Sequence, residues 1–179
     1  SEEILVGTTI VMKALNVSRA IIGIENNKKD AISGFNKLSK EYPNIEIQPL
    51  KVQYPQGGEK QLIDAVLKRQ VPSGSLPISV GAVVQNVGTI FAVYEAVQKN
   101  KPLIDRVVTI TGDHVSKPSN FLSRIGTPLN ILIEEAGGLP NGTGKIVSGG
   151  PMMGKALASI EIPLHPGAEK YYKEIGILE

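Results

Sequence analysis

The sequence predicts an α/β protein in which a layered parallel sheet is followed by a small second domain. Over about the first hundred residues, short β-branched apolar runs alternate with amphipathic helical patterns, which is typical of parallel strands joined by crossover helices. After Pro102 the order becomes two strands, a helix and further short strands, which is the order of a β-grasp domain. We therefore expect domains over 1–103 and 104–164, and a tail over 165–179 whose pattern is compatible with a short helix.

The composition excludes several classes of protein. The 179 residues are 41% hydrophobic and 20% charged, with a net charge of +2, so nothing indicates nucleic acid as a partner. The sequence contains no cysteine, which excludes a disulfide or an iron–sulfur cluster within it. No apolar run approaches the length of a membrane span and no signal-peptide pattern opens the sequence. We expect a cytoplasmic protein without a direct membrane span.

Local patterns predict each element of the first domain. The expected elements are a helix over 4–15 with Ser1 as N-cap, a strand over 19–25, a helix opened by Asn26 and Asn27, a strand over 45–50, a turn over 54–60, a helix with Leu62 and Ile63 on its buried face, a strand over 80–84, a turn over 85–89 and a helix ending near Lys99.

The second domain is predicted in the same way. The expected elements are a strand over 104–111, a strand within 115–125 that is broken at Pro118, a helix capped by Thr127 with Pro128 as its first residue, a strand over 145–148, a turn over 149–154 and a strand over 158–164.

Two polar turns follow strands of the expected parallel sheet. Right-handed crossovers place the C-terminal ends of all such strands at one edge, outside which ligands bind. Glu25, the turn over 54–60 and the turn over 85–89 should therefore meet at that edge. This convergence is the main functional inference from the pattern alone.

The turn over 85–89 predicts a site for part of a nucleotide-like cofactor. It directly precedes a helix, whose first N–H groups and positive dipole end favour an anion. Asn86 and Thr89 add side-chain hydrogen bonds, and Gly88 lets a ligand approach the backbone. The competing interpretation is that Asn86 only caps the helix.

The turn over 54–60 also has two interpretations. Gly57 and Gly58 could admit a ring or phosphate, beside Tyr54 and the carboxylate of Glu59. Alternatively, the glycines shape an ordinary turn and Glu59 complements a helix dipole. Spacing alone favours the ordinary turn, because short glycine motifs match by chance. His114 and His165 have no partners at metal-ligand spacing, so we expect no metal site.

Four motifs, taken together, resemble one protein family. They lie at 54–62, 83–89, 106–112 and 149–154, and they occur in the order found in RnfC, the peripheral subunit of the ion-pumping ferredoxin:NAD oxidoreductase. That subunit is similar to the FMN- and NADH-binding subunit of respiratory complex I and to PduS. The joint match reverses the preference for an ordinary turn at 54–60.

The resemblance implies a Rossmann-like FMN/NADH domain followed by an SLBB β-grasp domain, in a flavoprotein of electron transport. FMN would exchange electrons with NAD(H) and pass them to iron–sulfur clusters of the full-length subunit. By position, the isoalloxazine and nicotinamide would be bordered by Tyr54, Gly57, Gly58 and Glu59, with Lys60 in the same cofactor-binding set. Asn86, Gly88 and Thr89 would bind the ribityl or phosphate part. No side chain is expected to act as a catalytic acid or base.

The resemblance also implies features that this sequence lacks, namely an upstream glycine-rich flavin loop and downstream cysteine motifs. We therefore expect a fragment, or a diverged C-terminus after His165, that alone is inactive and binds FMN weakly or not at all. The implied partners are other Rnf-type subunits, at the inner face of the cell membrane. The alternative is a non-catalytic module whose SLBB half binds a ligand such as a cobalamin, or a partner protein, while the α/β half is a scaffold.

Overall fold

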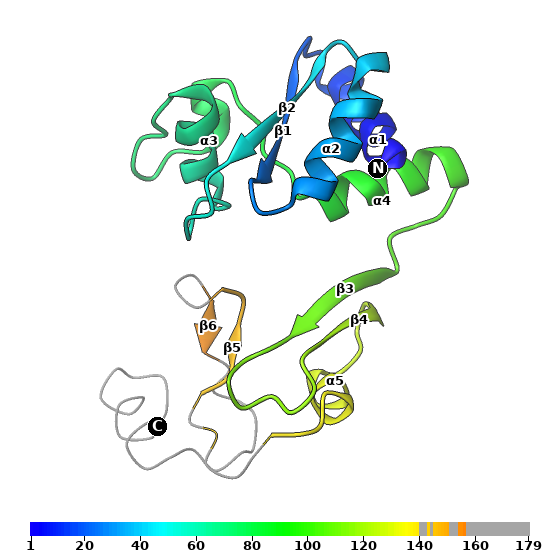
Figure 1. The fold of residues 1–179 in the computed structure, drawn as a ribbon, viewed down its shortest axis with the longest axis vertical. Helices are drawn as coiled ribbons and strands as arrows, with labels where there is room; N and C mark the ends of the chain where they lie inside the picture. The colour runs from blue at the N-terminus through cyan, green and yellow to red at the C-terminus, as the bar shows by residue number, and fades with distance from the viewer. Residues whose placement is uncertain (140–142, 144, 151–153, 157–179) are drawn as a thin grey trace. The chain divides into compact units, whose positions relative to one another are not determined.

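The structure is a computed structural model that describes residues 1–139, 143, 145–150 and 154–156. It falls into two compact units, Ser1–Leu103 and Ile104–Glu179 (Figure 1). The expected strand over 158–164 and the expected tail over 165–179 lie outside the described residues.

The first unit is an α/β fold with a parallel sheet, as the sequence predicts. Its elements are α1 (Glu2–Leu15), β1 (Ala20–Glu25), α2 (Lys29–Leu38), the 3₁₀ helix η1 (Ser39–Glu41), β2 (Ile45–Leu50), α3 (Glu59–Leu67), the 3₁₀ helix η2 (Pro77–Val80) and α4 (Val87–Lys99). Strands β1 and β2 pair in parallel, from Ala20 opposite Ile45 to Glu25 opposite Leu50. Both strands therefore end at the same edge of the sheet.

Helices cover both faces of this sheet. On one face, the core is formed by Leu5 and Met12 of α1, Phe35 of α2 and Ile45 of β2, with further strand side chains packed against it. On the other face, a Cβ added to Gly23 of β1 would lie 3.3 Å from a methyl group of Leu62 in α3. Figure 1 shows α1 and α2 on one side of the strands and α3 on the other. Burial on both faces explains why the strands read as apolar runs.

Helix α4 packs against α1 through a small residue. Gly7 of α1 is buried, and a Cβ added there would overlap the carbonyl oxygen of Ile90 in α4. Ile90 is itself buried. The close approach of the two helices holds the start of α4, and so the turn that precedes it.

The expected strand over 80–84 is wrong. Val80 instead ends η2, Gly81 follows with a left-handed φ of 69°, and residues 82–86 belong to no strand. Pro77 at the start of η2 favours a helical turn there, and among the described residues β1 pairs only with β2. A β-branched run forms a strand only when a neighbouring strand pairs with its backbone.

At the helix starts, one expectation is confirmed and one needs correction. Ser1 is the N-cap of α1, as expected, although it makes no side-chain cap hydrogen bond. Its amino group pairs with Glu3 at 3.0 Å. Helix α2 begins at Lys29, with Lys28 as N-cap, so Asn26 and Asn27 form a turn before it.

The second unit contains a hairpin and a helix. Its described elements are β3 (Asp105–Ile110), β4 (Ser119–Arg124), α5 (Leu129–Glu135), β5 (Val147–Ser148) and β6 (Lys155–Ala156). Strands β3 and β4 are antiparallel, as are β5 and β6. Leu132 and Ile133 of α5 are buried.

The details of this unit differ from expectation in two places. Pro128 is the N-cap of α5, not its first residue, and β4 begins directly after Pro118. Strand β6 has no counterpart among the expected elements, because a two-residue strand leaves no periodicity to read. Within the described residues, no helix combines the length and apolarity that crossing a bilayer requires.

Candidate functional site

The turn before α3 is closed by its own backbone. The N–H of Gln56 donates to the carbonyl of Gln53 at 2.7 Å, and the N–H of Gly58 donates to the carbonyl of Pro55 at 2.7 Å. Gly58 is then the N-cap of α3, in an extended conformation and with no side-chain cap hydrogen bond. The start of α3 therefore presents backbone N–H groups that no capping side chain occupies.

The two glycines of this turn differ in their surroundings. A Cβ at Gly57 would meet no atom within 4 Å, so the backbone there is open to a ligand. A Cβ at Gly58 would lie 2.6 Å from Oε1 of Gln61 and 3.0 Å from the Pro55 carbonyl oxygen. A side chain at residue 58 would thus displace the turn, whereas residue 57 is free for contact.

The polar side chains of the turn have different exposures and partners. Tyr54 is 51% exposed, and Glu59 is exposed in the first turn of α3, where the helix dipole favours its charge. Lys60 donates from Nζ to the carbonyl of Pro72 at 3.3 Å. Lys60 therefore holds the loop after α3 in this structure, although the family resemblance predicts it as a cofactor-binding residue.

Gln56 is not among the predicted site residues. Its Oε1 atom is buried and has no hydrogen-bond partner, and a buried acceptor without a donor is energetically costly. This residue stands between Pro55 and Gly57, within the motif at 54–62. Only the structure shows that this oxygen is buried, so the sequence carried no signal that separates Gln56 from its neighbours.

The turn before α4 is capped by its own asparagine. Oδ1 of Asn86 accepts a hydrogen bond from the N–H of Gly88 at 2.8 Å, and the carbonyl of Asn86 accepts from Thr89 and Ile90. The interpretation of Asn86 as a helix cap is therefore correct for its Oδ1 atom. A ligand at this place would still meet the amide nitrogen of Asn86 and the positive dipole end of α4.

Both turns lie toward the edge expected from the sheet. In Figure 1, the C-terminal ends of β1 and β2, the turn before α3 and the start of α4 all lie at the lower edge of the first unit. Arg69, which follows α3, donates to the carbonyl of Val80 at 2.8 Å, on the segment that leads to α4.

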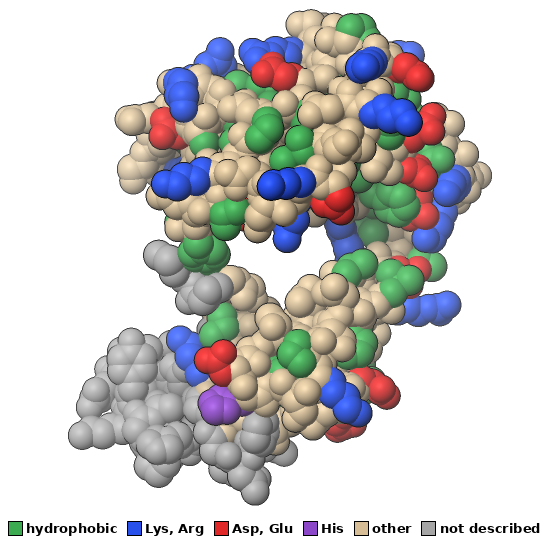
Figure 2. Space-filling model, viewed as in Figure 1, with side chains coloured by type: hydrophobic (Ala, Val, Ile, Leu, Met, Phe, Trp, Pro, Cys, Tyr) green, Lys and Arg blue, Asp and Glu red, His purple; other side chains and the backbone are tan. Residues whose placement is uncertain are grey.

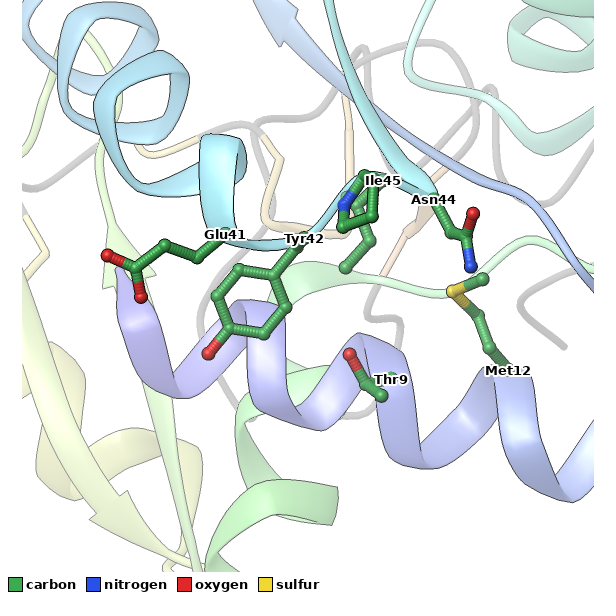
Figure 3. Close-up of a pocket in the computed structure, with 7 residues that line it drawn as sticks. Thr9, Met12, Glu41, Tyr42, Asn44 and Ile45 are labelled. Carbon is green, nitrogen blue, oxygen red and sulfur yellow. The ribbon is translucent and has the colours of Figure 1, made fainter.

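A cavity of about 200 Å³ lies at the other end of β2. It is lined by Thr9, Met12, Glu41, Tyr42, Pro43, Asn44 and Ile45; Figure 3 shows Met12 and Asn44 meeting at one end. Burial raises the pKa of the Tyr42 phenol, and the carboxylates of Glu2 and Glu41 raise it further. Because Ile45 begins β2 whereas Leu50 ends it, this cavity is separate from the two turns.

On the face seen in Figure 2, basic and acidic side chains are interspersed. Among the described residues, no group of three or more His, Cys, Asp or Glu side chains could hold a metal ion.

The first unit is an α/β domain with a parallel sheet, and the second unit contains a β-hairpin. Residues 1–95 match the family described as the Nuo51 FMN-binding domain, which is more than half of the chain. The chain therefore belongs to this family. Residues 107–156 match the SLBB domain.

The relatives of the chain carry consistent names. It is 46% identical over 168 residues to the C subunit of the proton-translocating ferredoxin:NAD(+) oxidoreductase complex of Clostridium ljungdahlii, covering 94% of this chain and 36% of that protein. It is 41% identical over 167 residues to the Na(+)-translocating counterpart of Acetobacterium woodii, covering 93% and 38%. It is 40% identical over 164 residues to the C subunit of the ion-translocating oxidoreductase complex of Yersinia enterocolitica, covering 92% and 24%.

These matches confirm the resemblance to RnfC. The chain spans about a quarter to two fifths of the relatives it matches. Each of these relatives is named as the C subunit of a complex.

Proposed function

We propose that this chain is part of an electron-transfer subunit that moves electrons between NAD(H), FMN and iron–sulfur clusters. The observation that carries the proposal is the pair of turns at one sheet edge, each opening a helix, in a domain of an FMN-binding family. The iron–sulfur clusters would be bound by parts of the full-length protein that contain cysteine, since this sequence has none.

The residues of the turns fit a flavin in several respects. The backbone at Gly57 is open, α3 begins without a capping side chain, and a buried acceptor on Gln56 has no donor. Tyr54, Gly57, Gly58 and Glu59 would border the isoalloxazine and nicotinamide rings, with Lys60 beside them.

The turn before α4 would hold the other end of the cofactor. Asn86, Gly88 and Thr89 would hold the ribityl or phosphate part at the N-terminus of α4.

Bound FMN would supply the hydride and electron chemistry at its ring. The contribution of this chain is then to bind and orient. Backbone N–H groups at the start of α3 would donate hydrogen bonds, the open backbone at Gly57 would permit close approach, and the charge of Glu59 would lie at the ring side of the site. No residue of the chain has to transfer a proton.

Replacing Glu59 by Gln in the full-length subunit tests this proposal. Because the substitution removes the charge but keeps the size of an exposed side chain, we expect NADH–acceptor activity to fall at least tenfold while circular dichroism shows the fold intact. Glu46→Gln is a matched control, since Glu46 is exposed in β2 and pairs with Arg19.

The alternative is a non-catalytic module in which the SLBB half binds a ligand such as a cobalamin, or a partner protein. One observation supports this alternative. Val107 and Leu122 lie opposite each other on β3 and β4, and they are 68% and 75% exposed, so the hairpin offers an apolar surface to a ligand or partner. Under this alternative, the Glu59 substitution would leave activity unaffected.

The partners and location follow from the same proposal. We propose that the full-length protein binds other Rnf-type subunits and lies at the inner face of the cell membrane through them. The support is that its relatives are named as subunits of ion-translocating complexes. Co-purification of the full-length protein with membranes, and its release by loss of the partner subunits, would test this.

A further inference from the structure

We infer that Arg69 is a positioning residue for the turn before α4, which it places by fixing the end of η2. The inference rests on the proposed function only in assigning a ligand to that turn. The contact itself is a property of the fold.

The guanidinium of Arg69 locks one backbone position. Its Nη1 donates to the carbonyl of Val80 at 2.8 Å. The same nitrogen would lie 3.5 Å from a Cβ at Gly81, so the guanidinium lies directly against the backbone of that glycine. Gly81 has a left-handed φ of 69°, a conformation that glycine adopts without strain. Arg69 therefore stabilises the residue at which the chain leaves η2.

Beyond this point the chain has little local support. The N–H of Gly81 donates to Ile78 and that of Ala82 to Pro77, which close η2. Over the described residues 83–86, no backbone N–H donates to a backbone carbonyl. The next bonds are those of the Asn86 cap. The segment is thus held at its two ends and free of backbone ties between them.

The two ends are held by different means. At the far end, Ile90 is buried against Gly7, so α4 is fixed by packing on α1. At the near end, the Arg69 bond is charge-assisted and lies at an exposed site. Arg69 follows the end of α3, whose first turn carries Glu59 and Lys60. Helix α3 thereby relates the two turns of the proposed site, one at its start and one through Arg69.

The test uses Arg69→Gln and Arg69→Lys in the full-length protein, with Arg19→Gln as the matched control. Arg19 is also exposed and pairs with Glu46 in the same unit, so its loss removes the same charge elsewhere. We expect Arg69→Gln to raise hydrogen–deuterium exchange at the amides of Gly81 and Ala82 by roughly fivefold. Lys at this position should restore part of the protection, and the control should not change it.

The second readout is FMN affinity. Arg69→Gln should weaken FMN binding by roughly fivefold and leave turnover at saturating FMN unchanged, because the residue positions the turn without touching the cofactor. Unchanged exchange at Gly81 and Ala82 would overturn the inference. Raised exchange with unchanged FMN affinity would overturn the positioning role for the cofactor.

The proposed function fails by a different result. If the unmodified full-length protein binds no FMN, the flavin proposal is lost, whereas the exchange measurement still decides whether Arg69 fixes the segment. The two failures are therefore distinguishable.

Discussion

At the scale of single residues, Asn86 has a role that is independent of any cofactor. Its Oδ1 accepts the N–H of Gly88 at 2.8 Å and so caps α4. Replacing a capping Asn by Ala costs about 1 kcal/mol, and we expect Asn86→Ala to lower the free energy of unfolding of the first unit by this amount. Asn36→Ala, on the exposed face of α2, is the control and should leave it unchanged or slightly higher. Equal stability of the two variants in urea titrations would contradict the cap.

Tyr42 should make the stability of the first unit depend on pH in the alkaline range. Burial and the carboxylates of Glu2 and Glu41 raise the pKa of its phenol above the ordinary value of 10.0. The unfolded chain would release this proton near pH 10, whereas the folded chain would keep it to higher pH. The stabilisation is then fully present below pH 10 and is lost as the pH rises through the folded pKa.

Absorbance titration of the wild type and Tyr42→Phe measures this directly. The difference between the two curves should be a single phenol that ionises above pH 10. A difference curve centred at or below pH 10 would show that the phenol is not held by its surroundings.

At the scale of elements, the contact between α1 and α4 gives an opposed pair of glycine substitutions. Ala favours a helix interior over Gly by about 1 kcal/mol. Gly34 of α2 has no atom within 4 Å of its would-be Cβ, so Gly34→Ala should stabilise the protein. Gly7→Ala would push against the Ile90 backbone and should destabilise it by about 2 kcal/mol.

Thermal melting of the two variants decides between propensity and packing. We expect a higher melting temperature for Gly34→Ala and a lower one for Gly7→Ala. A rise for both would mean that α4 is not packed on α1 as closely as the structure shows.

At the scale of the whole molecule, the chain is expected to hold only part of a flavin site. It spans about a quarter to two fifths of the relatives that it matches, and the two turns supply one side of the proposed pocket. We therefore expect FMN to bind this chain weakly, with a dissociation constant above about 100 μM, or not at all. Fluorescence titration of the purified chain measures it. Micromolar binding would show that the two turns are sufficient.

In the second unit, apolar side chains occupy the exposed face of a hairpin as well as its packed face. One face of the β3–β4 hairpin exposes Val107 and Leu122 opposite each other. The periodicity of the two strands predicts that one face is apolar and packed, and Ser123 and Phe121 lie on that less exposed face. It does not predict that apolar side chains also occupy the solvent face.

Much of the element order could be predicted because it depends on neighbours in sequence. Helices α1, α3 and α4 and strands β1 and β2 lie where apolar spacing placed them, to within one or two residues at most ends. Periodicity, glycine and proline act within one or two turns of chain. The four motifs likewise identified the family, because they depend on the order of residues alone.

By itself, therefore, the sequence determined the α/β class, most of the helix and strand positions and the two turns that open α3 and α4. Only the tertiary structure decided that residues 82–86 stay outside the sheet, that the Oε1 atom of Gln56 is buried without a partner and that Arg69 reaches the Val80 carbonyl. The physical reason is one of range. A helix forms from contacts three or four residues apart, whereas strand pairing, burial and a side-chain bond across eleven residues depend on segments that only folding brings together.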